Sequence, residues 1–199
     1  INLIINVDYV SNDQLWNVMI GSHSDDLSNC NEIKRWPCVT ICKELASSNL
    51  VLSSPFGGLI YLISPENGGQ INFTMNNIVE SPFIDLTQPN TVNDWERRKN
   101  ASGLWAELAG ENIIFTTPSK CIRHLSLKQC VDVLNFWDRV CETHHNLRST
   151  NVKDYKRERV VNDIQPSCGY MHSGYPIVTH LDCCEPVSYT HLRAHETLM

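Results

Sequence analysis

The hydrophobic residues of this chain change their spacing in its second half, and this change constrains the fold more than any other feature. Ser126-Leu127-Lys128-Gln129 is a capping box, in which the serine hydroxyl can accept a hydrogen bond from the Gln129 amide and the glutamine can reach back. Apolar side chains then recur at helical spacing: Leu127, Cys130, Val131, Leu134, Trp137, Val140, Cys141 and Leu147. The pattern predicts an amphipathic helix that ends near Arg148, where cations suit a helix C-terminus.

The first half of the chain has the spacing of strands instead. Short apolar runs are separated by Gly, Pro and Asn at roughly 8–12 residue intervals, as in antiparallel sandwiches. The runs are residues 15–20, 39–45, 49–53, 58–63 and 70–79, with a further predicted strand at 112–116. We therefore predict an α+β chain, with an antiparallel β-sandwich-like region over residues 1–120 and a helix plus β-hairpin over residues 121–186.

The composition narrows the possible classes of function. The net charge is -6 and the basic residues are scattered, whereas nucleic-acid binding usually needs a basic face, so we expect no nucleic-acid partner. Apolar runs are all shorter than the about 18 residues of a membrane span, so no transmembrane segment is predicted in this chain. The chain begins with Ile1 rather than Met, which suggests an internal fragment, and the lack of a leader says little about the parent protein.

The nine cysteines are an odd number without a Cys-x-x-Cys pair, so zinc-ribbon spacing is absent. Several fall within apolar patterns, where cysteine behaves as a small hydrophobe, and we favour reduced, buried thiols over a disulfide framework. The sequons Asn72-Phe73-Thr74 and Asn100-Ala101-Ser102 favour secretion instead. Such tripeptides often arise by chance, so an intracellular compartment is expected.

Three motifs have both a functional and a structural interpretation, and we favour the structural one for each. Residues 21–28 combine one His, two Asp and three hydroxyls, which could bind calcium or form an Asp/Ser-capped turn. Gly57-Gly58 opens an apolar strand, where a turn with positive φ is simpler than a phosphate cradle. His144 and His145 would point about 100° apart on a helix, so they could not easily bind one metal ion together. We favour a role as histidines at the C-terminal end of the helix.

Residues 159–182 are expected to form the two strands of the hairpin, joined by a turn rich in Pro and Gly. Their polar residues are denser than a core hairpin needs: Gln165, Ser167, His172, Ser173, His180 and Asp182. No Gly-x-Ser-x-Gly elbow occurs, and nothing near Cys168 in the sequence would activate its thiol, so no serine or cysteine nucleophile is predicted. For His172 and His180 we favour neutral hydrogen bonds that cap and cross-link the hairpin. The alternative is a position that faces a cleft and bonds substrate backbone or second-shell groups.

Five blocks occur in the same order as in a known family: W-N-V-M-I-G-S-H-S-D-D-L-S at residues 16–28, K-R-W-P at 34–37, P-F-G-G-L-I-Y at 55–61, L-W-A-E-L-A-G at 104–110, and the stretch 159–182. Together they resemble the enhancin-like, mucin-degrading metallopeptidase family, family sixty, and most closely its animal branch, the TRP-melastatin channel-associated factors. The resemblance covers Trp16 to Pro186. Its most specific piece is Y-M-H-S-G-Y-P-I, at residues 170–177.

The resemblance implies a β-sandwich-like region that leads into a gluzincin-type α/β catalytic region. Its zinc helix, with His-Glu-Leu-Gly-His and a distant Glu ligand, would follow the block at residues 169–180, so the chain is expected to end before that helix. No metal ligand is carried over: no cofactor is expected in this chain, and zinc is expected in the full-length domain if the motif is intact. His195-Glu196 lacks the second His, because position 199 is Met, and residues 187–199 are expected to be a non-native tail that resembles translated adaptor sequence.

The resemblance implies two functions. The first is the N-terminal portion of an enhancin/mucinase-type zinc metallopeptidase-like domain, inactive alone, whose parent acts on a peptide or glycoprotein. On this hypothesis the substrate-binding cleft strand is formed by Tyr170, His172, Ser173, Tyr175 and His180. The alternative is a non-enzymatic channel-associated factor that binds a TRP-melastatin-type channel and regulates its delivery or activity at the plasma membrane; it favours an intracellular, peripheral location over secretion. Glycan binding by residues 1–120 is a third, weaker interpretation.

Overall fold

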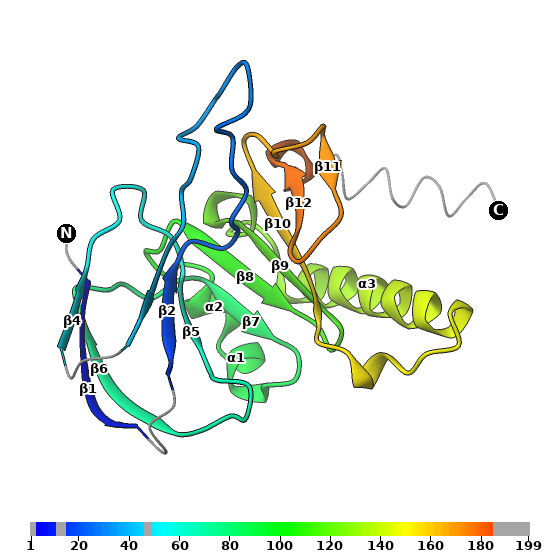
Figure 1. The fold of residues 1–199 in the computed structure, drawn as a ribbon. Helices are drawn as coiled ribbons and strands as arrows, with labels where there is room; N and C mark the ends of the chain where they lie inside the picture. The colour runs from blue at the N-terminus through cyan, green and yellow to red at the C-terminus, as the bar shows by residue number, and fades with distance from the viewer. Residues whose placement is uncertain (1–2, 11–14, 46–48, 185–199) are drawn as a thin grey trace. The chain divides into compact units, whose positions relative to one another are not determined.

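The structure is a computed structural model that describes residues 3–10, 15–45 and 49–184. The chain forms two compact units (Figure 1). The first consists of Ile1–Ser24 and Cys38–Val79, and the second of Asp25–Pro37 and Glu80–Met199. The predicted division at residue 120 falls inside the second unit, between a strand and the long helix.

The first unit contains two three-stranded antiparallel sheets. One has the order β4-β1-β6 and the other the order β3-β2-β5. The strands are β1 (Leu3–Val10), β2 (Asn17–Ile20), β3 (Ile41–Glu44), β4 (Asn49–Leu52), β5 (Ile60–Ile63) and β6 (Ile71–Asn76). Both sheets contribute to one buried cluster, which includes Ile5 from β1 and Val18 from β2, each fully buried. The predicted antiparallel, sandwich-like region is thus confirmed for this part of the chain.

The glycine pair before β5 forms a tight turn. Gly57 and Gly58 have φ angles of 64° and 127°, a region of backbone conformation that only glycine adopts without strain. A Cβ on Gly58 would also lie 3.0 Å from the backbone nitrogen of Gly21. The structural interpretation of this motif is confirmed, because the turn leads into a strand and not into a helix.

The second unit is built on a six-stranded mixed sheet with the order β11-β12-β10-β9-β8-β7. Its strands are β7 (Phe83–Asp85), β8 (Trp105–Ala109), β9 (Ile113–Pro118), β10 (Glu158–Asp163), β11 (Met171–His172) and β12 (Ile177–His180). The pairs β7/β8, β9/β10 and β10/β12 are parallel, whereas β8/β9 and β11/β12 are antiparallel. Shorter helices join the strands: α1 (Pro89–Asn93), α2 (Trp95–Arg98), η1 (Ser119–Cys121), η2 (Val152–Asp154) and η3 (Leu181–Cys184).

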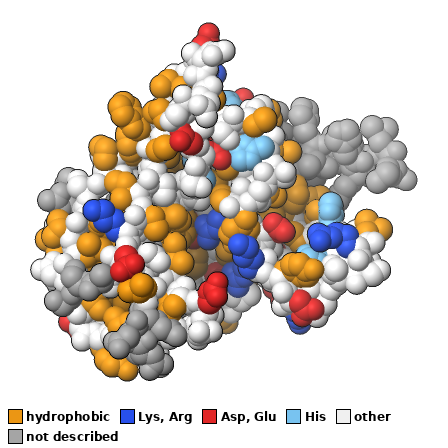
Figure 2. Space-filling view, in the orientation of Figure 1, with side chains coloured by type: hydrophobic (Ala, Val, Ile, Leu, Met, Phe, Trp, Pro, Cys, Tyr) orange, Lys and Arg blue, Asp and Glu red, His pale blue; other side chains and the backbone are white. Residues whose placement is uncertain are grey.

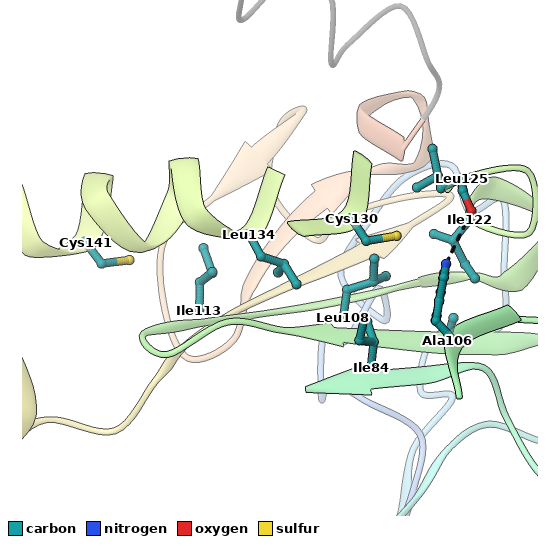
Figure 3. Close-up of a cluster of buried hydrophobic side chains, with 10 residues drawn as sticks. Ile84, Ala106, Leu108, Ile113, Ile122, Leu125, Cys130, Leu134 and Cys141 are labelled. Carbon is teal, nitrogen blue, oxygen red and sulfur yellow. Dashed lines mark hydrogen bonds between the residues drawn. The ribbon is translucent and has the colours of Figure 1, made fainter. Parts of the chain in front are cut away.

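The long helix α3 (Leu127–Leu147) covers one face of this sheet. Its capping box is complete, with Ser126 as N-cap and Arg148 as C-cap, as predicted. Figure 3 shows Cys130, Leu134 and Cys141 pointing from α3 toward the strand residues, and all three are buried. Burying such side chains supplies most of the stabilisation of a helix of this kind.

A buried carboxylate also ties α3 to the sheet. Asp138 accepts hydrogen bonds from the backbone amides of Glu111 (2.8 Å) and Asn112 (2.7 Å), which form the turn between β8 and β9. A Cβ on Gly110 would lie 2.4 Å from the Asp138 Oδ2 atom. This turn therefore needs both a glycine and an aspartate, contributed by elements far apart in the sequence.

The prediction of a single hairpin over residues 159–182 is wrong. β10 and β12 are parallel neighbours, and only the two-residue strand β11 pairs antiparallel with β12. Parallel strands need a crossover connection, and the Gly- and Pro-rich residues between β10 and β12 supply it. The polar and apolar pattern of a strand does not reveal its direction, so the sequence could not distinguish these arrangements.

The cysteines divide between the interior and the surface. Cys130 and Cys141 are buried, as their place in the helical pattern predicted, and Cys184 is buried as well. The prediction of buried thiols is wrong for the exposed residues Cys38, Cys42 and Cys168.

Among the helices of the described ranges, none combines the length and the apolar character needed to cross a bilayer.

Candidate functional site

The segment Asp25–Pro37 folds onto the β10–β12 end of the sheet in the second unit. Arg35 Nε donates to Asp163 Oδ2 at 2.6 Å, and these side chains are only 9% and 6% exposed. The segment is also held by Gln165, whose Oε1 accepts from the Lys34 amide at 2.6 Å and whose Nε2 donates to the Glu32 carbonyl at 2.9 Å. We call this set of contacts the Arg35–Asp163 clasp.

A second polar cluster lies beside the clasp. Asp25 Oδ2 lies 2.7 Å from His172 Nε2 and accepts from the Ser167 amide at 2.8 Å. Burial opposes the ionisation of Asp25, but the hydrogen bonds from His172 and Ser167 outweigh it and lower the pKa of the carboxyl. The hydrogen bond with Asp25, and then that with the Ser173 carbonyl, raise the pKa of His172. The protonated imidazole is favoured, because both ring nitrogens can then donate.

This cluster is not arranged as a catalytic triad. The Ser167 hydroxyl, at 3.3 Å, and Asp25 both face His172 Nε2, while Nδ1 lies 3.0 Å from the Ser173 carbonyl. A triad needs the hydroxyl and the carboxylate on different ring nitrogens, so that the ring can accept the hydroxyl proton. The predicted neutral hydrogen bonds that would cross-link a hairpin through His172 are therefore wrong: its partner is Asp25 in the segment 25–37, and its pKa is raised.

β11 forms the end of the sheet among the described residues. The His180 amide donates to the Tyr170 carbonyl at 2.9 Å, so the backbone N–H and C=O of Tyr170 point toward β12. Along an antiparallel strand, the backbone groups of successive residues point alternately toward and away from the partner strand. The N–H and C=O of Met171 therefore point away from β12, toward the outer edge. Met171 is 61% exposed and Tyr170 is 56% exposed, and Figure 2 shows histidine and hydrophobic side chains together on the surface at this end of the sheet.

The connection around β11 is stiffened by ring contacts. The rings of Tyr170 and His180 stack, with centroids 5.4 Å apart, and His180 Nδ1 lies 3.1 Å from Asp182. Lys156 Nζ lies 3.4 Å above the centre of the Tyr175 ring, a favourable cation–π geometry. The tyrosines therefore present their aromatic surface in defined positions.

The five predicted site residues lie close together along β11, β12 and their connection. The structure adds residues that the sequence interpretation missed, namely Asp25, Arg35, Asp163 and Met171. The polar density of residues 21–28 is a signal, but it predicts one local motif that contains both Asp25 and Asp26. In the structure Asp26 Oδ1 caps a local turn by accepting from the Ser28 amide at 2.8 Å, which agrees with the favoured turn, while Asp25 binds residues more than 140 positions away.

Two further ion pairs connect strands of the same sheet. Arg159 of β10 donates to Glu107 of β8 and to the Thr116 hydroxyl of β9. Arg157, just before β10, donates to Asp85 of β7 at 2.9 Å. Glu107 and Thr116 alternate along their strands with core residues under α3, so they lie on the face of the sheet away from that helix. Charges thus link the strands on this face, whereas apolar packing dominates the other.

The described residues do not fit a zinc ion. Within residues 3–10, 15–45 and 49–184, no group of three or more His, Cys, Asp and Glu side chains could hold a metal. His144 is exposed, while His145 is buried and bonds to the Thr150 hydroxyl at 2.8 Å, so the two do not converge. His195, Glu196 and the predicted tail at 187–199 lie outside the described residues.

Comparison with protein families gives two matches that cover most of the chain. Residues 79–194 match the family described as peptidase M60, enhancin and enhancin-like. Residues 3–76 match the N-terminal domain of M60-like peptidases. The border between the matches coincides with the change from the first to the second compact unit near residue 79.

Among curated proteins, the chain is 33% identical over 173 residues to TRPM8 channel-associated factor 2 of Homo sapiens, covering 85% of this chain and 18% of that protein. It is 34% identical over 168 residues to a TRPM8 channel-associated factor homolog of Danio rerio, with coverage of 83% and 18%. The chain therefore spans only 18% of the length of these relatives.

Solved structures share the fold at low sequence identity. A metallopeptidase from Bacteroides thetaiotaomicron superposes with a TM-score of 0.64 at 13% identity, over 92% of this chain and 32% of that one. The M60 catalytic domain of Clostridium perfringens ZmpC, solved with the sialyl T antigen, has a TM-score of 0.59 at 9% identity, over 92% and 42%. These similarities confirm the α+β fold class, with antiparallel sheets first and a mixed α/β sheet after them.

Proposed function

Because this chain belongs to the peptidase M60, enhancin and enhancin-like family, we propose that its second unit is the substrate-binding side of an M60 peptidase-like domain. The occupant is an extended peptide of a glycoprotein, which adds to the sheet along β11. No catalytic step is assigned to the described residues, since they do not fit a zinc ion. Zinc is proposed only for the full-length domain, where metal analysis of the purified protein tests it.

The position of β11 at the end of the sheet carries this proposal, because no other strand of the described residues pairs with its outer edge. In strand addition, main-chain hydrogen bonds give affinity and pockets or platforms for side chains give specificity. Met171 offers the outward N–H and C=O groups. Tyr170 and Tyr175 are 56% and 48% exposed. On the ring faces opposite His180 and Lys156, a sugar or an apolar side chain could stack. The Arg35–Asp163 clasp and the Asp25–His172 pair hold this edge in place.

The proposal is tested by calorimetric titration of this chain with an O-glycopeptide and with the same peptide lacking the sugar. Met171→Pro removes the outward N–H, and we expect at least about a tenfold loss of affinity, or about 1.4 kcal/mol. Tyr170→Ala should weaken the glycopeptide more than the bare peptide. Leu147→Ala is the matched control, because that side chain is 81% exposed at the far end of α3. Equal affinity of Met171→Pro and the parent chain would exclude strand addition at β11.

A second candidate is a non-enzymatic channel-associated factor located inside the cell, peripheral at the plasma membrane. The relatives of 33–34% identity support it, since each is named for association with the TRPM8 channel. On this proposal the chain is one part of a protein that binds a TRP-melastatin-type channel and regulates its delivery or activity.

Direct binding separates the two candidates. Purified TRPM8 channel in detergent is immobilised, and this chain is passed over it with and without excess O-glycopeptide. Saturable binding that the glycopeptide does not displace supports the channel-associated candidate. Displacement by the glycopeptide supports one shared peptide-binding edge, and a lack of saturable binding rejects a channel contact through these residues.

A further inference from the structure

Two cysteines from distant parts of the sequence meet at one point of the second unit. Cys121 is the last residue of η1, directly after β9, and Cys184 is the last residue of η3, directly after β12. They are 63 positions apart, yet their Sγ atoms lie 2.7 Å from each other. η3 packs against both β9 and β10, so the sheet itself brings the two thiols together.

The two thiols differ in their surroundings. Cys184 is 4% exposed, and its thiol donates to the Leu181 carbonyl at 2.8 Å. Cys121 is half-buried and packs against the apolar cluster under α3, so it is the more exposed of the two thiols. The other buried cysteines, Cys130 and Cys141, lie in the apolar core under α3.

We propose that Cys121 and Cys184 are a site of oxidative modification, at which a low-molecular-weight disulfide such as oxidised glutathione converts the two thiols into a protein disulfide. The bond would join η1 to η3 and close the loop that contains α3, β10, β11 and β12. Such a link stabilises chiefly by restricting the unfolded chain, more so for a long loop. It would fix the end of β12 to the end of β9.

The reaction is two successive thiol–disulfide exchanges. The Cys121 thiolate attacks one sulfur of oxidised glutathione, forming a mixed disulfide and releasing one glutathione thiolate. Cys184 then loses its proton and attacks Cys121 Sγ, and the second glutathione leaves. Two protein thiols are oxidised, one glutathione disulfide is reduced, and the two protons pass to the two glutathione thiolates.

The second exchange is expected to limit the rate. Burial, and then the neighbouring Cys121 thiol, raise the pKa of Cys184 to about 12. Since the thiolate is the nucleophile, the rate of disulfide formation should increase with pH across the neutral and mildly alkaline range. The mixed disulfide on Cys121 should therefore accumulate at lower pH and disappear at higher pH.

The test is incubation of the folded chain with oxidised glutathione, followed by alkylation of the remaining thiols and mass spectrometric peptide mapping. The proposal predicts a cross-linked peptide pair with Cys121 and Cys184, lighter by two hydrogen atoms, which dithiothreitol separates. Cys184→Ser should stop the reaction at the glutathione adduct of Cys121. Cys183→Ser is the matched control, because it changes the adjacent thiol and should leave the cross-link intact.

Two results would overturn the proposal. One is a predominant cross-link of Cys121 to Cys183 or Cys168. The other is full alkylation of Cys121 and Cys184 under conditions in which exposed Cys168 carries glutathione. The mapping of the unsubstituted chain decides between these outcomes even if a serine variant does not fold.

Discussion

The α3 face and the β11 end of the six-stranded sheet are stabilised in different ways. Under α3, side chains such as Leu134 and Ile122 are fully buried in an apolar cluster. At the β11 end, the buried contacts are charged, with the Arg35–Asp163 clasp and the Asp25–His172 pair. Apolar contacts tolerate small shifts because their energy depends little on orientation. The clasp depends on hydrogen bonds, which need defined distances and angles between donor and acceptor. The difference predicts that substitutions under α3 lower the stability of the whole unit. Substitutions at the β11 end should first loosen that end of the sheet.

The largest effect is expected from Leu134→Ala. This side chain is fully buried between α3 and the sheet, and truncation removes its transfer free energy and leaves a cavity, for about 3–5 kcal/mol of lost stability. Urea unfolding followed by circular dichroism measures the change. Leu147→Ala, at an 81% exposed position of the same helix, should lose less than about 0.5 kcal/mol. Equal losses for both variants would contradict apolar packing as the source of stability on this face.

Asp163→Ala should have the next largest effect. It leaves the Arg35 guanidinium buried without its carboxylate, and breaking one partner of a buried pair costs about 3 kcal/mol. Hydrogen exchange should show faster exchange in residues 25–37 and in β10 before the rest of the unit. The control is Asp132→Ala, which breaks an ion pair with Lys128 on the surface of α3 and should cost less than about 1 kcal/mol.

Asp138→Ala tests a polar contact at the edge of the apolar face. It removes the acceptor for the Glu111 and Asn112 amides, and we expect a loss of about 2 kcal/mol. Asp138→Asn keeps one acceptor oxygen and should lose roughly half as much. Thermal unfolding of the two variants measures this order. If Asp138→Ala unfolds at the temperature of the parent chain, the turn between β8 and β9 does not depend on this carboxylate.

The smallest effect is a pH dependence confined to the β11 end. The folded pKa of His172 is raised above 6.5, so its contribution is complete below pH 6.5 and is lost as the pH rises through the folded value. The folded pKa of Asp25 is lowered below 3.8, so its contribution is present above pH 3.8 and is lost as the pH falls through the folded value. The Asp25–His172 pair therefore stabilises the β11 end most between pH 3.8 and pH 6.5.

Hydrogen exchange of the Ser167 amide, which donates to Asp25, measures this dependence. Its protection, corrected for intrinsic exchange, should fall as the pH rises through the raised pKa of His172, while protection in α3 stays constant. Asp25→Asn should remove the dependence, because the histidine then lacks its charged partner. A parallel loss of protection in α3 would show that the pH acts on the whole unit.

Parts of the fold could be predicted because their signals are local. The capping box at Ser126 and the apolar spacing after it define α3 to within about one residue, and Gly57-Gly58 marks its turn. The strands β2 to β6 also follow from short apolar runs. β1, β7, β8 and the two short helices were not predicted, since three- to five-residue elements are identified by packing more than by propensity, and β1 carries several polar residues among its apolar ones.

The candidate site was predictable only in outline. The unusual polar density of residues 170–180 pointed to this part of the chain, and the predicted residues do lie together there. Their contribution to substrate binding stays a prediction. The partners that hold them could not be predicted, because Asp25 and Arg35 reach residues 128 or more positions away. Neither local spacing nor charge pattern specifies which distant side chain completes such a contact.

The sequence by itself determined the α+β class, the boundaries of α3, the strand-rich first unit and the family. These properties depend on hydrophobic period, capping and short motifs, which act over a few residues. Only the tertiary structure decided that β10 and β12 run parallel, that residues 25–37 belong to the second unit, and that Cys121 meets Cys184. Those contacts arise where the twisted sheet brings remote segments together, and their free energy depends on burial and exact distance, which a linear sequence does not contain.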